Sequence, residues 1–541
     1  MTPLELERLV REGRDLHGQS LVGMNLSGKN LAGAKLRGAD LSDAVLVGAD
    51  LRGADLAEAR LCNANLRQAI LEGAHLAAAD LTKAALQLAF LDGARLHRAK
   101  LVETRFDLAR MRDAWLDGAS IEQCAFTRAE LSRTSLRECR ILQTAFVEAK
   151  LDHVDFEGAN LEHVTFMRAD LRRARLPKIM RFTLFDEALL SNLDLEGSDL
   201  KAAELEGHDL SGVNLENAQL EGISLRGTKL RGARLRNATL RNANLMNCDL
   251  TDADFEGADL QGCIFIGATL RGVDLRDKDL KVVIFSEADL EGANLSGSCF
   301  EVCNFDQANL KGANLTRALF KQVSMTKAAL EGVILERTTF HSVDFSGIDL
   351  THLRFRGMSM GNCCFTEAKM QGMDLRGCDF TSSDFSKADL RAADFRECTL
   401  SYANFMETNL EGTQFSGVVA KGAFFGAAIL RRARLDGARL RYATFTAADA
   451  SEANFRGADL RESLWVEAKA MATCFADARM QYADLSHARF RRADLSGANL
   501  TRANLHALDD ERADYTAAIL LFVKRTDEAR FAAETWVRPE R

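Results

Sequence analysis

Proline is almost absent from this chain of 541 residues, which carries only 3. An average usage of about 5% would give roughly 27. Proline removes a backbone N–H donor, so it is excluded from regular hydrogen-bonded ladders. Pro3, Pro177 and Pro539 all lie outside the regular pattern described below. The scarcity of proline therefore supports an architecture built on backbone ladders.

Long apolar runs are also missing. No stretch of 18 apolar residues occurs, which excludes a membrane-spanning helix. Residues 1–15 have no apolar segment of the kind found in secretory signals. Twelve cysteines in a long chain without a signal do not indicate a secreted disulfide scaffold. We therefore expect a cytoplasmic protein, with export by a signal-independent secretion system as the alternative.

Catalytic signatures are not found either. The sequence holds no Walker A, G-x-S-x-G, H-E-x-x-H or C-x-x-C motif. The ten histidines are scattered and none pairs with an evident nucleophile. We therefore predict that the protein is not an enzyme and has no catalytic residue, no cofactor and no metal site.

The charge balance is weak, with 70 basic and 78 acidic residues and a net charge of −8. This balance argues against direct binding of nucleic acid. Residues 151–300 are the exception, because they carry 17 basic against 26 acidic side chains. A hydrophobic fraction of 47% is enough for a core and excludes wholesale disorder.

The dominant feature of the sequence is an apolar residue at every fifth position. The series runs from Leu16 to Leu176 and again from Phe185 to Leu520. Of 31 phenylalanines, 26 fall on this position. A period of five fits neither an α-helix nor a flat strand. It predicts a solenoid whose chain turns a corner once in each group of five residues.

The number of sides follows from a longer period. Phenylalanine recurs at every fourth apolar position, as at Phe385, Phe405 and Phe425, whereas the corresponding series from Leu190 to Leu350 is all leucine. Four pentads therefore make one coil, and equivalent side chains of successive coils are expected to stack.

These pentads resemble the pentapeptide-repeat family, whose consensus is Ala-Asp/Asn-Leu-x-x. Matches include 39–41, 64–66, 243–245 and 498–500. The resemblance covers about 505 of the 541 residues. It implies an all-β fold, a right-handed quadrilateral β-helix solenoid of about 25 coils. It does not imply a single function.

The sequence predicts five regions. Residues 1–15 form an N-terminal capping helix, with Thr2 as N-cap and Leu6, Leu9 and Val10 as its apolar stripe. Residues 16–176 and 185–520 form one solenoid. Residues 177–184 form a break around Pro177 that is one residue short, and two abutting solenoids are the alternative. Residues 521–541 form a C-terminal helical cap.

A partner surface is predicted from outward-facing positions that carry aromatic or aliphatic residues where the repeat normally has polar ones. Tyr402, Tyr442 and Tyr482 recur at equal intervals of two coils and share one edge of the solenoid, with Phe424 and Leu464 in intervening coils. Exposed aromatic residues at this density are typical of a contact surface. The alternative is that these residues occur by chance on a surface that accepts many residue types. A smaller candidate surface consists of Ile264 and Ile284.

The C-terminal region has two interpretations. It is a cap, or it is a homodimer contact made by Phe522, Phe531 and Trp536. The resemblance favours the second slightly, because the C-terminal region of some gyrase-protecting family members mediates dimerisation.

The leading functional hypothesis is a non-enzymatic, rod-shaped scaffold or adaptor of a bacterial cell that binds a protein along one face. The resemblance implies two alternatives. One is a component, adaptor or effector of a type VI or other specialised secretion system. The other is a DNA mimic that binds gyrase or topoisomerase through the acidic residues of 151–300. The basic residues from Arg226 to Arg241 interrupt that acidic track.

Overall fold

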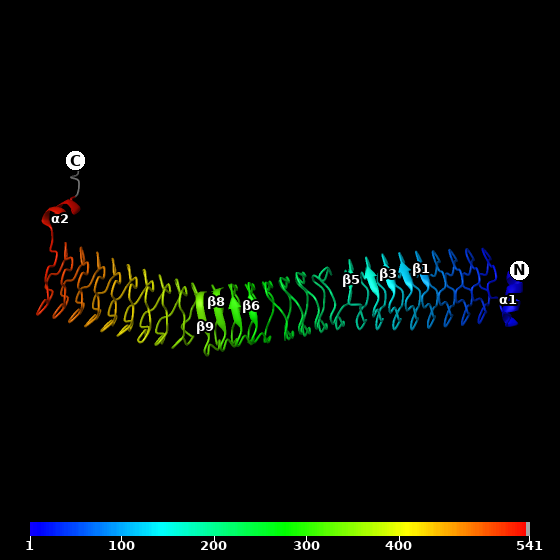
Figure 1. Ribbon diagram of the computed structural model, residues 1–541, viewed down its shortest axis with the longest axis horizontal. Helices are drawn as coiled ribbons and strands as arrows, with labels where there is room; N and C mark the ends of the chain where they lie inside the picture. The colour runs from blue at the N-terminus through cyan, green and yellow to red at the C-terminus, as the bar shows by residue number, and fades with distance from the viewer. Residues whose placement is uncertain (537–541) are drawn as a thin grey trace. The chain divides into compact units, whose positions relative to one another are not determined.

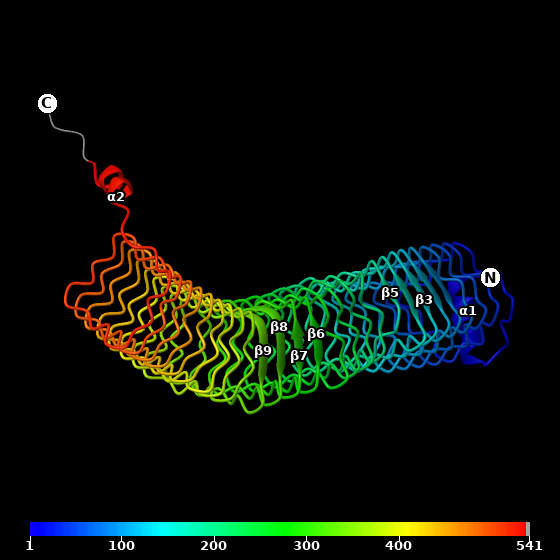
Figure 2. The same ribbon diagram turned by 60° about the vertical axis from the view of Figure 1, so that its left-hand side comes forward.

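The computed structural model describes residues 1–536. They form stacked coils that divide into two compact units, Met1–Val273 and Asp274–Arg541. Figures 1 and 2 show the coils of each unit as open loops lying one on another. Parallel bridges join equivalent residues of successive coils, as between Asp15 and Lys35 or Asn404 and Phe424. The predicted all-β solenoid of four-pentad coils is confirmed.

Only short stretches are flat enough to form strands, because each side of a coil is a single pentad. In the first unit a parallel sheet contains β1 (Lys100–Val102), β2 (Ser120–Glu122), β3 (Arg140–Leu142), β4 (Asn160–Glu162) and β5 (Met180–Arg181). In the second unit a parallel sheet contains β6 (Asp279–Lys281), β7 (Cys299–Glu301), β8 (Leu319–Ser324) and β9 (Thr339–Asp344). Elsewhere in residues 1–536 the coils pair through single bridges.

Most pentads outside the strands turn their corners by the same hydrogen bonds. In the pentad that begins at Phe385, the N–H of Ala388 donates to the Phe385 carbonyl (3.0 Å) and Lys387 has φ +59°. This bond and a positive φ at the third residue are the features of a type II turn. The side chain of Asp384 accepts from the N–H of Ser386 (2.9 Å), which has no ladder partner within residues 1–536. The Asp/Asn preference of the repeat is therefore an Asx turn that satisfies the one backbone donor the ladder leaves over.

In most pentads the central residue and the small residue two places before it point inward and are buried. Rings at the same position of successive coils stack, with centroids 4.9 Å apart for Phe405 and Phe425 and for Phe425 and Phe445. Most threonines at the small inward position donate to a carbonyl of the preceding coil, as Thr408 does to Phe385 (2.7 Å). The core is therefore a set of columns in which each side chain packs on its equivalents in the coils above and below.

Eight cysteines take the small inward position and are buried free thiols. Cys398 donates to the Leu375 carbonyl (2.9 Å), and burial raises the pKa of its thiol to about 12. Cys378, one coil earlier, is also free. These thiols fill core volume and are held in the neutral, unreactive form.

Short helices lie at both ends, in agreement with the predicted fold class. Helix α1 (Pro3–Arg11) begins with a capping box between Thr2 and Glu5, and its Leu6 is buried. Helix α2 (Glu528–Glu534) has Asp527 as its N-cap. Residues 537–541 of the predicted C-terminal cap lie outside the described residues. No helix within residues 1–536 is long and apolar enough to cross a membrane.

The sequence break is confined to one side of one coil in the first unit. Met180 is buried and takes the inward position only four places after Leu176. Bridges therefore span one residue fewer here, as between Arg175 and Asp194, and return to the full coil at Ile179 and Asp199. The buried hydroxyl of Thr183 has no hydrogen-bond partner among the described residues. The hydroxyls of the other inward threonines donate to a carbonyl of the preceding coil. Because one residue is missing here, Thr183 is not in register with such a carbonyl.

The left-handed corner positions lead to a stability prediction. Val282 has φ +56° and an exposed side chain, although β-branched residues are strained there. Relief of this strain exceeds the entropy cost of glycine, so Val282→Gly should raise the free energy of unfolding by about 0.5–1 kcal/mol. Hydrogen exchange of the peptides around residue 282 measures it. The reciprocal control is Gly292→Val, because a Cβ at Gly292 (φ +66°) meets nothing within 4 Å. If both variants changed the free energy of unfolding in the same direction, backbone strain at Val282 would be contradicted.

Candidate protein-binding surface

The predicted tyrosines lie in one column on a corner of the second unit. Tyr402, Tyr442 and Tyr482 each occupy the left-handed third position of a pentad, with φ +61°, +65° and +61°. Their side chains are 60%, 43% and 54% exposed. Phe522, two coils beyond Tyr482, has φ +58° and is 77% exposed. The column therefore presents an aromatic ring on every second coil.

Phe424 and Leu464 border this column at the position before an inward residue, and they are 37% and 43% exposed. The rings of Tyr402 and Phe424 each lie against the backbone of a glycine. A Cβ added to Gly422 would lie 2.9 Å from the ring of Tyr402, and one added to Gly426 would lie 2.9 Å from the ring of Phe424. The two glycines thus provide flat backbone on which the rings lie.

Cations alternate with the aromatic rings. The guanidinium carbon of Arg441 lies 4.6 Å from the centroid of Tyr442, and the Lys421 ammonium lies 5.8 Å from it. Arg502 lies between two rings, 5.6 Å from Tyr482 and 5.9 Å from Phe522, and donates to the Tyr482 hydroxyl (3.1 Å). The surface, called the aromatic corner below, is therefore both aromatic and basic. Its aromatic and aliphatic members are Tyr402, Phe424, Tyr442, Leu464, Tyr482 and Phe522.

The remaining predicted residues are not part of this surface. Ile264 is half-buried in the first unit and pairs with Asn244, whereas Ile284 is half-buried in the second and pairs with Asn304. Phe531 lies on α2 with its ring centroid 6.5 Å from that of His506, and Trp536 follows α2 with its side chain exposed. Only Phe522, among the residues predicted for a dimer contact, lies in the tyrosine column.

The repeats match known family models over most of the chain. A model described as pentapeptide repeats matches residues 15–113, 179–217, 228–301, 303–341, 428–464 and 473–507. A second, the pentapeptide repeat region, matches 109–180 and 333–445. The chain belongs to the pentapeptide-repeat family.

Solved pentapeptide-repeat structures resemble parts of the chain. HetL, involved in heterocyst differentiation regulation in the cyanobacterium Nostoc sp. strain PCC 7120, is 28% identical over 49% of this chain and 97% of its own, with a TM-score of 0.28. QnrB1, a plasmid-mediated fluoroquinolone resistance protein, is 24% identical over 35% of this chain and 92% of its own, with a TM-score of 0.26. No curated protein matches the sequence significantly.

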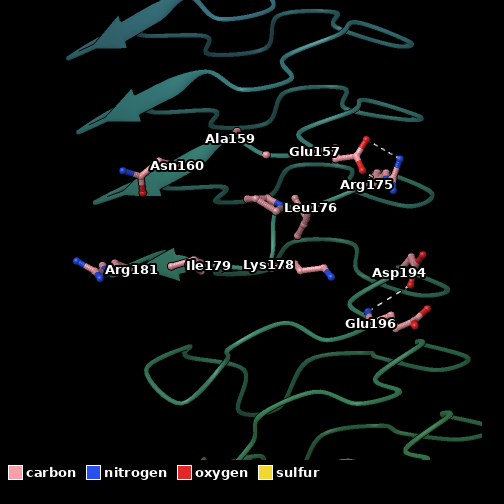
Figure 3. Close-up of a pocket in the computed structure, with 12 residues that line it drawn as sticks. Glu157, Ala159, Asn160, Arg175, Leu176, Lys178, Ile179, Arg181, Asp194 and Glu196 are labelled. Atoms are coloured by element: carbon pink, nitrogen blue, oxygen red, sulfur yellow. Dashed lines mark hydrogen bonds and ion pairs between the residues drawn. The ribbon is translucent and has the colours of Figure 1, made fainter.

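The break in this pentapeptide-repeat solenoid creates a groove that the sequence did not predict. Its volume is 710 Å³, and Leu176, Pro177 and Ile179 are the larger apolar residues that line it. Figure 3 shows Arg175 and Glu157 facing each other at one rim, where they form an ion pair of 2.9 Å. Pro177 and the shortened step between aromatic residues signalled an irregular coil. They did not indicate that shortening one side would open the surface.

A second unpredicted feature is a cluster of ionisable side chains where α2 meets the last coils. The Nε2 atoms of His487 and His506 lie 3.2 Å and 3.0 Å from the Glu534 carboxylate. The two histidines are separated by one position less than a full coil, so the repeat places them side by side on adjacent coils. That spacing was available in the sequence. The approach of Glu534 was not, because it depends on how α2 folds back.

The acidic segment of the first unit does not form an uninterrupted carboxylate track. Bridges place Asp194, Asn214, Arg234 and Asp254 in one column. Lys229 lies between Asp209 and Asp249 in another. Opposite charges therefore alternate along these columns, as the sequence indicated.

Proposed function

We propose that this pentapeptide-repeat protein is a non-enzymatic scaffold of the bacterial cytoplasm that binds a protein partner through the aromatic corner. The column of Tyr402, Tyr442, Tyr482 and Phe522 carries the proposal. Interfaces are enriched in tyrosine, phenylalanine and arginine relative to the rest of the surface. A regular solenoid repeats them along one edge, so an extended partner segment can contact several at once.

The cations define the chemistry of the partner. Arg441 is paired with Glu462 (2.5 Å), but Lys421 and Arg502 have no carboxylate partner among residues 1–536. A segment that offers apolar side chains to the rings and acidic side chains to Lys421 and Arg502 complements this surface. The charge contribution should weaken with salt, because exposed pairs are screened.

The two other roles predict different partners. A type VI or other secretion role predicts that the bound protein is a spike or adaptor component. DNA mimicry predicts gyrase or topoisomerase bound to the acidic residues of 151–300, and the basic residues within the acidic columns argue against it. The homodimer contact through Phe522, Phe531 and Trp536 stays a prediction.

The test uses the partner obtained by affinity purification of the tagged protein from its native host. The double variant Phe424→Ser with Tyr442→Ser should weaken partner binding by about 30-fold or more, because each ring is expected to contribute about 1–2 kcal/mol. Calorimetric titration of the purified partner measures the affinity.

The matched control is Ile429→Ser with Met471→Ser, on other sides of the same unit. Their side chains are 39% and 44% exposed, close to the 37% and 43% of Phe424 and Tyr442. This control should bind like the parent, and both variants should keep its melting temperature. If the double variant of Phe424 and Tyr442 bound the partner as tightly as the parent does, the aromatic corner would be rejected as the partner site.

A further inference from the structure

The cluster at α2 brings together ligand atoms from three separate parts of the second unit. His487 occupies a left-handed corner position, and His506 follows the inward Leu505 on the next coil. Glu534 is the last residue of α2. The three ligand atoms, two histidine nitrogens and one carboxylate oxygen, all lie within 4.8 Å of one another.

Surrounding contacts hold the three side chains in place. Arg530 donates to Oε1 of Glu534 (2.6 Å), which leaves Oε2 facing both histidines. The His506 side chain is only 3% exposed, whereas those of His487 and Glu534 are about one-third exposed. The site is therefore oriented from the protein side and open on the solvent side.

We propose that this cluster binds a Zn²⁺ ion through Nε2 of His487, Nε2 of His506 and Oε2 of Glu534. Two imidazoles and a carboxylate are ligands that zinc accepts, with bonds of about 2.0–2.2 Å. A tetrahedral ion with such bonds separates its ligand atoms by about 3.3 Å. The two nitrogen–oxygen distances, 3.0 and 3.2 Å, are close to that spacing, and the two histidine nitrogens lie within 4.8 Å of each other. A water molecule would supply the fourth ligand from the side where His487 and Glu534 are partly exposed, and the ion would fasten α2 to the coils.

One contact must change when the ion binds. The N–H of Asp527 donates to Nδ1 of His506 (3.2 Å), which places the proton of the neutral ring on Nε2. Metal coordination needs Nε2 bare and the proton on Nδ1. Asp527 is exposed, so its N–H can turn to water when the ring changes tautomer.

The experiment titrates the full-length, metal-stripped protein with ZnCl₂ in a calorimeter and with Co²⁺ in a spectrophotometer. We expect one ion per chain and a visible absorption typical of tetrahedral Co²⁺. The near-ultraviolet sulfur-to-cobalt band that cysteine thiolates produce should be absent. Glu534→Gln should weaken Zn²⁺ binding by about 10-fold or more, the size of effect seen even when only an outer-shell partner is removed.

The control is His75→Asn, which removes a histidine that contacts a single carboxylate, that of Asp55 (3.2 Å). This variant should bind Zn²⁺ like the parent. His487→Asn provides a second test on a side chain that is partly exposed and not needed for the core. Absence of Zn²⁺ binding by the parent, or Glu534→Gln and His487→Asn variants that bind Zn²⁺ as tightly as the parent does, would overturn the proposal.

Discussion

Replacement of Phe425 by alanine is expected to lower the local free energy of unfolding by about 3–5 kcal/mol. Phe425 is fully buried, stacks between Phe405 and Phe445 at 4.9 Å on each side, and meets Phe415 edge-on at 6.2 Å. Removal of the ring leaves a gap in a column whose members cannot move along the solenoid axis without breaking the ladder. Part of the cost is therefore the cavity itself.

Hydrogen exchange read by mass spectrometry measures this effect, because a solenoid opens locally and a global melting curve would average over many coils. Peptides that cover residues 400–450 should lose protection, whereas those in distant coils should not. Phe424→Ala is the control. It changes the same residue type one position away, on the exposed side, and should stay within about 0.5 kcal/mol. Equal effects would contradict the assignment of position 425 to the core.

A proline pair tests the ladder itself. Asn404→Pro removes the hydrogen bond from the N–H of Asn404 to the Ser383 carbonyl (2.9 Å) and should cost about 3 kcal/mol or more. Ser401→Pro lies three residues earlier, at the second position of the turn, where its N–H has no acceptor within residues 1–536. Proline is common at that position of type II turns, so this variant should change stability by less than about 1 kcal/mol.

The same exchange experiment compares the two variants. Loss of protection confined to the coils around Asn404 supports a ladder in which each coil depends on its neighbours. If Ser401→Pro were as damaging as Asn404→Pro, the explanation of proline scarcity offered above would be wrong.

The fold could be predicted because nearly every pentad carries the same pattern of residue types. The inward residue, the small residue before it and the Asp/Asn of the Asx turn recur at fixed offsets, so no single pentad has to be interpreted alone. The helix at Pro3–Arg11 could also be predicted from a local signal, since Thr2, Pro3 and Glu5 determine its first turn. Exposure of Tyr402, Tyr442 and Tyr482 followed from the same offsets.

The sites that sequence reasoning missed depend on departures from the repeat. The two-coil interval between the tyrosines also leads from Tyr482 to Phe522, so the fourth ring of the column was available but had been assigned to the end of the chain. The groove beside Pro177 could not be predicted, because its depth depends on how the shortened side repacks around Met180. The contact of Glu534 with His506 depends on the path of residues 521–527 and has no periodic signal.

Site-specific photo-crosslinking in the native host tests the central claim most directly. A photoreactive phenylalanine analogue replaces Tyr442 in one strain and Ala472 in another. Ala472 is exposed and has the same left-handed backbone, but the repeat places it at the opposite corner of its coil. We predict one covalent protein adduct at position 442, weaker when Phe424→Ser is added, and none at position 472. No adduct at position 442, or the same adducts at both positions, would contradict a protein-binding aromatic corner.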